Sequence, residues 1–340
     1  MLLVIFGAGA SYDSVLHLPP PPPGYRRDPH EDSRLPLANH LFDDRGLFVA
    51  VMDQYTACKP LVNLLRGEIQ VEQQLAKFEE QAKTFPPRRS QLAAIRYYLH
   101  NMLWNCQNNW QSYHHGITNY STFLDAVERW RFTQNEHVCF VTFNYDTMLE
   151  ASMQDLWGYW FKDFNTYISS PDFKLIKLHG SVDWGLCLPK VRYRAPAEVI
   201  DAAAFGVDIS QEFRKVTRTP VILDDGNLGF PAIAIPVQNK RDFSCPPEHL
   251  TALADVLPKV TKIITIGWRA TEQHFLKILK SPLTGLKNGL DTMIVSGSMK
   301  DAEETRNNLG LSLGPPSVLI DKGFSALIRD RLEQLEHFLW

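Results

Sequence analysis

The chain has 340 residues, enough for one large α/β domain with an inserted module. Its formal net charge of −3 provides no overall positive field for a nucleic-acid backbone, so direct nucleic-acid binding is not expected. The five cysteines are scattered and never spaced as CxxC, which argues against a disulfide framework and a zinc ribbon. A reducing compartment, the cytoplasm, is therefore predicted.

Short runs of β-branched and apolar residues recur along the chain, with longer segments between most of them. This pattern predicts an α/β fold with a doubly wound, mostly parallel, Rossmann-like sheet. No window reaches the roughly 18 to 20 apolar residues of a membrane span, so no membrane association is expected. The runs are Leu2–Phe6, Val138–Phe143, Lys174–Leu178, Ala232–Val237, Lys262–Ile266, Thr292–Val295 and Val318–Ile320.

Between the first two runs, apolar residues return at helical spacing, as in Leu92, Ile95 and Leu99. We expect an inserted helical module over residues 41–130, with residues 1–40 and 131–340 forming the main α/β domain. If Trp104 and Trp110 in this module are exposed, self-association is a reasonable expectation.

Two segments have a less regular pattern. The proline tract Pro19–Pro23 must stop any helix after the first strand and predicts a long loop. Residues 185–230 contain several prolines and one helical patch around Ala202–Val216. We interpret 185–230 as a covering loop or small subdomain over an edge of the sheet.

A glycine-rich turn, Gly7–Ser11, directly follows the first run. Small or absent side chains at such a turn let the backbone approach a pyrophosphate, although a tight turn without a ligand would have the same residues. In a dehydrogenase, an acidic residue follows about 20 positions later. Here that position falls near Glu31 and Asp32 in the proline-rich loop, which makes hydride transfer a weaker interpretation.

Polar and small residues follow several of the predicted strands: Asn144–Asp146, His179–Ser181, Gly267–Trp268 and Ser296–Ser298. In an open parallel sheet these exits face one crevice, the usual ligand site of such folds. Each segment alone is better explained as a turn, a helix cap or a structural histidine. Together with the glycine turn they indicate a shared ligand site.

The sequence lacks the motifs of several other kinds of functional site. There is no HxxxH pair or carboxylate–histidine cluster for a metal, no GxSxG turn for a serine hydrolase and no Walker sequence for an ATPase. No metal is therefore expected.

The blocks Gly7–Ser11, Thr142–Asp146 and Leu178–Ser181 resemble the signature blocks of the sirtuin-like fold, in the version found in bacterial antiphage NAD-consuming proteins. The resemblance implies that NAD is the substrate, that Asn144 lies beside the nicotinamide ribose, and that His179 faces the ribose hydroxyls as a base. It further implies cofactor contacts from Gly7, Ala8, Gly9, Ala10, Ser11, Asp146, Gly180, Gly267, Trp268 and Ser296.

The sequence departs from the protein-deacylating sirtuins because the four-cysteine zinc module is missing, and residues 185–230 contain only Cys187. Water, rather than an acetylated peptide, is then the expected acceptor. The resemblance thus implies an NAD glycohydrolase that releases nicotinamide and ADP-ribose, acting as an antiphage effector in abortive infection. Two alternatives stay open: a subunit that senses NAD or ADP-ribose without turnover, and an ADP-ribosyltransferase.

The chain has no evident sensor domain, so the trigger is expected to come through self-assembly into a homo-oligomer or through a separately encoded partner. Proteins that this one resembles are found beside a HerA-type helicase or an Argonaute-type subunit.

Overall fold

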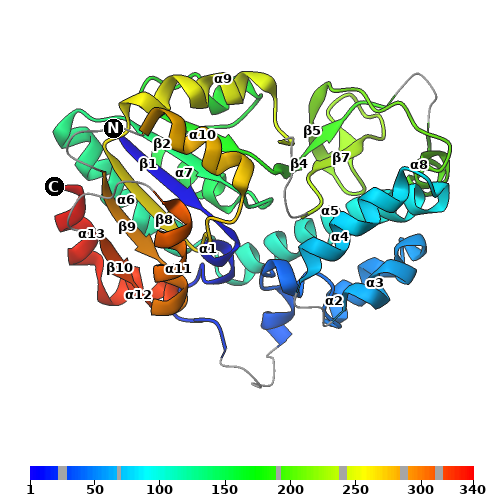
Figure 1. Ribbon diagram of the computed structural model, residues 1–340, viewed down its shortest axis with the longest axis horizontal. Helices are drawn as coiled ribbons and strands as arrows, with labels where there is room; N and C mark the ends of the chain where they lie inside the picture. The colour runs from blue at the N-terminus through cyan, green and yellow to red at the C-terminus, as the bar shows by residue number, and fades with distance from the viewer. Residues whose placement is uncertain (22–28, 67–69, 189–192, 237–242, 284–289, 311–316) are drawn as a thin grey trace.

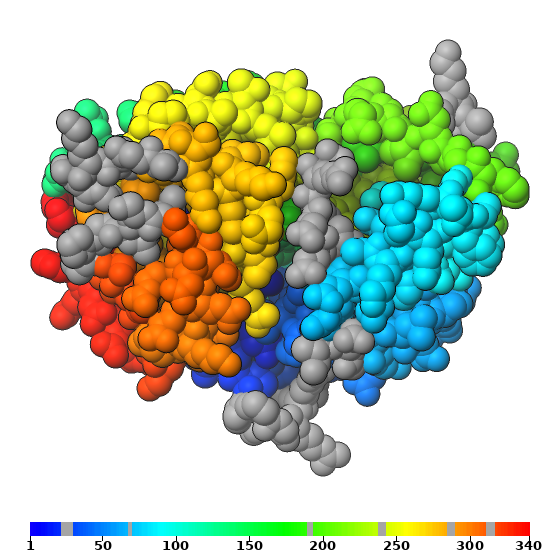
Figure 2. All heavy atoms as spheres, viewed as in Figure 1, coloured from blue at the N-terminus to red at the C-terminus, as the bar shows by residue number. Residues whose placement is uncertain are grey.

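The computed structural model describes residues 1–21, 29–66, 70–188, 193–236, 243–283, 290–310 and 317–340. The described elements form two lobes. One lobe contains a parallel sheet with its covering helices, and the other contains helices α2 to α5 with a smaller sheet (Figures 1 and 2). Three positions discussed above lie outside the described residues: Pro22 and Pro23 of the proline tract, and Val237 of a predicted strand.

The larger sheet has six strands in the order β10-β9-β8-β1-β2-β3, and every neighbouring pair is parallel. This is the strand order of dinucleotide-binding folds, with the direction of winding reversing between β1 and β8. Six of the predicted strands are confirmed within one residue at each end. The strands are β1 Leu2–Phe6, β2 Val138–Thr142, β3 Phe173–Lys177, β8 Lys262–Ile266, β9 Asp291–Val295 and β10 Val318–Ile320.

Helices cover both faces of this sheet, as right-handed crossovers require when the winding reverses. Helix α6 packs against α7, α12 and α13, whereas α10 and α11 lie in front of the sheet in Figure 1. The helices of this lobe are α1 Ala8–Tyr12, α6 Asn119–Gln134, α7 Met148–Trp157, α9 Pro247–Val256, α10 Gln273–Leu283, α11 Met299–Leu309, α12 Gly323–Asp330 and α13 Leu332–Leu339.

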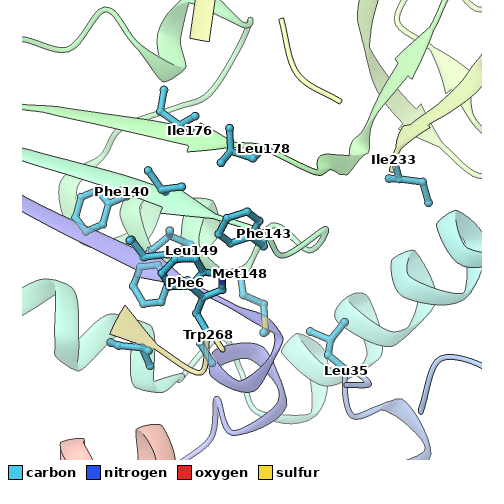
Figure 3. Packing of buried hydrophobic residues seen from close by; sticks show 14 of the residues in the cluster. Phe6, Leu35, Phe140, Phe143, Met148, Leu149, Ile176, Leu178, Ile233 and Trp268 are labelled. Carbon is cyan, nitrogen blue, oxygen red and sulfur yellow. The ribbon is translucent and has the colours of Figure 1, made fainter. Parts of the chain in front are cut away.

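The strands are mostly apolar because both faces of the sheet are covered. All five residues of β1 and all five of β2 are buried. Figure 3 shows Phe6, Phe140 and Ile176 packed along three adjacent strands, with Phe143 and Leu178 just beyond the strand ends. The core therefore extends up to the edge at which the polar motifs begin.

The second lobe begins with four helices: α2 Gly46–Met52, α3 Lys59–Leu65, α4 Val71–Ala82 and α5 Pro86–Tyr113. Helix α5 packs against other elements on several sides. Trp110 is consequently fully buried and donates its indole N–H to Ser14, so its side chain does not provide the exposed surface on which self-association was to depend. Trp104 is partly buried against the core.

Helix α6 continues to Gln134 and packs against α7, so it crosses the module boundary predicted at residue 130. The division into 1–40 with 131–340 and 41–130 remains a prediction. Short 3-10 helices connect several elements: Pro29–Ser33, Ala38–His40, Thr56–Cys58, Asn165–Tyr167 and Leu257–Lys259.

A second, antiparallel sheet has the order β6-β5-β4-β7. It corrects two expectations: Ala232 and Ile233 of the predicted strand Ala232–Val237 lie in this sheet rather than in the parallel one, and Val216 lies on a strand rather than in a helix. The helix of this segment ends at Ala203. The elements are β4 Gly180–Leu186, α8 Pro196–Ala203, β5 Phe213–Arg218, β6 Ile222–Leu223 and β7 Phe230–Ile233.

Among the described residues, no helix is both long enough and apolar enough to cross a membrane.

Candidate functional site

The turn after β1 and the turn after β8 are packed directly on each other. The Gly9 N–H donates to the Gly267 carbonyl at 3.1 Å, and the Gly7 N–H donates to Ile266 at 3.0 Å. A Cβ on Gly7 would lie 2.5 Å from the Gly267 oxygen, and Gly267 itself has a φ of +62°. These glycines thus let two segments of the chain meet at the point where the winding reverses, and the N–H groups of Gly7, Gly9 and Ala10 are already used within the protein.

A buried polar network joins this turn to the exit of β2. The Asn144 side-chain amide donates to Ser11 at 2.9 Å and to Tyr120 at 3.3 Å. Ser11 donates to the Asp146 carboxylate at 2.7 Å and lies 2.9 Å from the Tyr120 hydroxyl. A hydroxyl has one donor and two acceptor positions, so the Ser11 side chain is fully engaged. Three of the predicted site residues are therefore in direct contact.

Asn144 retains one unused group. Both of its amide hydrogens are donated, but its Oδ1 is buried and has no hydrogen-bond partner. An unpaired buried acceptor costs about 1–3 kcal/mol, and a hydroxyl or water donor would remove that cost. The Asp146 carboxylate accepts from Ser11 and from the Met148 N–H and still has acceptor capacity.

An aromatic cluster lies beside the polar network. The ring of Phe143 meets the ring of His179 edge-on at 4.9 Å between centroids and stacks on Trp268 at 5.5 Å. Tyr145 stacks against His179 on another side, at 6.3 Å. Figure 3 shows Phe143 and Trp268 facing one another from two strand ends. The exits of β2, β3 and β8 thus come together, with His179 half-buried among aromatic rings.

Trp268 and Gly180 each have a structural role. Trp268 is 3% exposed and donates its indole N–H to Glu272 at 2.6 Å. Gly180 has a φ of +81°, and a Cβ there would overlap the carbonyl oxygen of Ala232 on β7. Gly180 thus permits the chain to pass from the parallel sheet into the antiparallel one.

Ser296 lies further along the same edge. Its N–H donates to Ile320, and its carbonyl accepts from Gly323. It follows β9, and both β8 and β1 lie between β9 and β2. At a strand spacing of about 4.8 Å, Ser296 is on the order of 14 Å from the end of β2. Only an extended ligand could contact both Ser296 and Asn144.

Sequence reasoning missed three residues of this site. Tyr120, on α6, connects Ser11 with Asn144, and burial raises its pKa well above the ordinary value. Lys177 is wholly buried at the end of β3, where it donates to the carbonyl of Asp146 and pairs with Glu150 at 2.8 Å. Glu272 belongs to no recognisable motif. It accepts a hydrogen bond from the Trp268 indole, and burial raises the pKa of its carboxyl. No short motif contains these residues, so only spatial proximity could reveal them.

Within the described part of the chain, no group of three or more His, Cys, Asp or Glu side chains could hold a metal ion.

The fold and the site define an α/β protein with the dinucleotide-binding strand order and with polar and aromatic residues gathered where the winding reverses.

Comparisons with known proteins gave matches among solved structures. A complex of a Sir2 homologue with NAD has a TM-score of 0.41 at 12% sequence identity, and the match covers 100% of this chain and 90% of that one. A Sir2 complex with a p53 peptide and NAD+ has a TM-score of 0.39 at 14% identity, covering 98% and 92%. No family model and no curated protein matched. We therefore base the functional proposal on the side chains themselves.

Proposed function

We propose that this protein binds NAD at the carboxyl edge of its parallel sheet and hydrolyses the nicotinamide–ribose bond, releasing nicotinamide and ADP-ribose. The observation that carries the proposal is the hydrogen bonding of Ser11 to both Asn144 and Asp146, with the buried Asn144 Oδ1 left unpaired. The sequence blocks that contain these residues are those that resemble sirtuin-like NAD-consuming proteins.

The chemistry requires little from the protein. In NAD the nicotinamide ring is already cationic and departs neutral, so no general acid is needed, in contrast to the departing oxygen of a glycoside. The site must stabilise a positively charged ribose and present water to it. Asn144 Oδ1 is an acceptor for a ribose hydroxyl or for the attacking water.

His179 is the proposed base. An imidazole nitrogen can accept a proton as a general base. The surrounding rings of Phe143 and Tyr145 hold the orientation of His179 and limit the access of bulk water. Asp146 is proposed to accept from the nicotinamide carboxamide, since its carboxylate retains free lone pairs.

The remaining predicted residues are proposed to contact the rest of the dinucleotide. The turn formed by Gly7, Ala8, Gly9, Ala10 and Ser11 would lie against the pyrophosphate, because its small or absent side chains permit close approach. Ser296 would contact the far end, at the distance that an extended dinucleotide can span.

In the cell, this activity would deplete NAD during phage infection and cause abortive infection. We propose that the trigger comes through assembly, either into a homo-oligomer or with a separately encoded partner of the HerA-helicase or Argonaute type. This part of the proposal rests on the resemblance of the sequence blocks.

The decisive experiment measures nicotinamide and ADP-ribose released from NAD by the full chain, alone and in its assembled state. Asn144→Ala and His179→Ala should each lower the rate at least about 100-fold. The exposed His337→Gln on α13 is the matched control and should retain the wild-type rate. In cells challenged with phage, equal NAD levels for wild type and both site variants would contradict the proposal.

Two outcomes would favour the alternatives. NAD binding without nicotinamide release in the assembled state would indicate a sensor subunit. Label from NAD appearing on protein or nucleic acid, rather than in free ADP-ribose, would indicate ADP-ribosyl transfer.

A further inference from the structure

A cavity of about 270 Å³ lies in the second lobe, between the helical module and the antiparallel sheet. Its walls come from α4, α5, α8, the segment after α8, and β7, which lie together at the right of Figure 1. None of Ser11, Asn144, Asp146 or His179 lines it. The cavity therefore has none of these residues in its walls, although Arg96 is near enough to interact electrostatically with Tyr145 beside His179.

The lining is apolar except for three charged residues, Glu79, Arg89 and Arg96. The Arg89 guanidinium is already engaged, because it donates to the carbonyls of Ala82 at 2.8 Å and Lys83 at 3.2 Å at the end of α4. This leaves Arg96 as the cation whose hydrogen-bonding groups are available.

Arg96 has no hydrogen bond or ion pair with any described residue, and its Nε is buried without a partner. Its guanidinium lies 5.5 Å from the centre of the Phe230 ring, which also lines the cavity. Burial lowers the pKa of Arg96, and the nearby Glu79 carboxylate only partly opposes this effect. Arg96 is partly exposed as a whole, but its buried, unpaired Nε–H is costly, and a bound anion that accepts from it would reduce that cost.

We propose that this cavity binds a small amphipathic monoanion, a carboxylate with an apolar chain of about six to eight carbons, whose headgroup pairs with Arg96. The size follows from the volume: at roughly 30 Å³ per water, 270 Å³ is the space of about nine non-hydrogen atoms. A single available guanidinium matches one carboxylate, which it can bind through two parallel hydrogen bonds.

The apolar walls decide against inorganic phosphate as the occupant. Buried side chains such as Leu92, Val199 and Phe230 offer no hydrogen bonds to phosphate oxygens, whereas they would cover an alkyl chain.

The test is calorimetric titration of the full chain with sodium octanoate in the absence of NAD. We expect one-to-one binding, and 1-octanol, which has the same chain without the charge, should bind at least about tenfold more weakly. Arg96→Gln should weaken octanoate binding by a similar factor.

Two further variants make the result independent of any folding defect in Arg96→Gln. Ala93→Leu adds volume inside the cavity without changing charge and should also prevent binding. Lys83→Gln removes a positive charge from the exposed end of α4 and should leave octanoate affinity within about twofold.

Absence of octanoate binding by the wild type would overturn the proposal, as would equal binding of octanol or unchanged affinity in both Arg96→Gln and Ala93→Leu. Because the titration contains no NAD, its failure would leave the proposed hydrolysis untouched.

Discussion

The two sheets of this protein hold their charged residues differently. At the end of β3 in the parallel sheet, Lys177 and its partner Glu150 are 0% and 8% exposed. In the antiparallel sheet, Lys215 and Asp183 form a similar pair but are 18% and 21% exposed. The buried pair also holds the backbone of Asp146, whereas the second pair bridges β5 and β4 near water. The backbone of Asp146, at the candidate site, is thus held by a buried ion pair.

The junction between the two sheets gives the largest expected effect. Gly180→Ala should destabilise the protein by at least about 4 kcal/mol, because its φ is +81° and a Cβ would overlap the Ala232 carbonyl. Gly158→Ala is the matched control: its φ is +62°, but nothing lies within 4 Å of the added carbon. Its cost should be about 1 kcal/mol. Urea unfolding measures both, and equal costs would mean that the two sheets do not meet tightly at Gly180.

The two lysine pairs provide the next test. Lys177→Met should cost about 3–4 kcal/mol, since it leaves Glu150 buried without its cation and removes a donor from the Asp146 carbonyl. Lys215→Met should cost about 1–2 kcal/mol, because water can reach Asp183. Unfolding free energies at neutral pH decide between them. A larger loss for Lys215→Met would reverse the comparison between the sheets.

A buried histidine at the interface of α5 and β4 gives a pH-dependent effect. The Nε2 of His100 lies 2.6 Å from the Val182 carbonyl, and burial lowers the pKa of His100 to about 4. The unfolded chain therefore binds this proton first as pH falls. The stabilisation is complete above about pH 6.5 and is lost as pH decreases toward 4, by about 3 kcal/mol in total.

The check is urea unfolding of wild type and His100→Gln between pH 7 and 4. The wild type should lose about 3 kcal/mol more than the variant over this range. Parallel stability curves would show that His100 is protonated equally in the folded and unfolded states.

The smallest expected effect on stability comes from removing a single tyrosine hydroxyl, and it separates a loss of stability from a loss of activity. Tyr120→Phe removes a hydroxyl that contacts Ser11 and Asn144, and Tyr98→Phe removes one that donates to the Leu41 carbonyl far from the site. Each should cost about 1 kcal/mol in unfolding free energy. Only Tyr120→Phe should slow nicotinamide release, because only it loosens Asn144. If both variants retained full activity, the polar network would be structural only.

The sequence by itself determined the parallel sheet and the position of its polar edge. A strand buried on both faces is apolar at most positions, so runs such as Leu2–Phe6 and Lys262–Ile266 can be identified from the sequence. Glycine at close backbone approaches and polar residues directly after buried strands are also local signals. Gly7, Asn144 and His179 could therefore be assigned to one edge before any coordinates.

Only the tertiary structure decided the rest, because the remaining features depend on contacts between segments distant in the chain. Strand β5 is short and partly exposed, so its sequence pattern did not distinguish a strand from a helix. Its pairing with β4 makes it a strand. The burial of Trp110 depends on Ser14, and the role of Tyr120 depends on residues 109 positions before it and 24 after it. The spacing of apolar residues indicates which face of a helix or strand is buried. It does not indicate which other segment of the chain packs against that face.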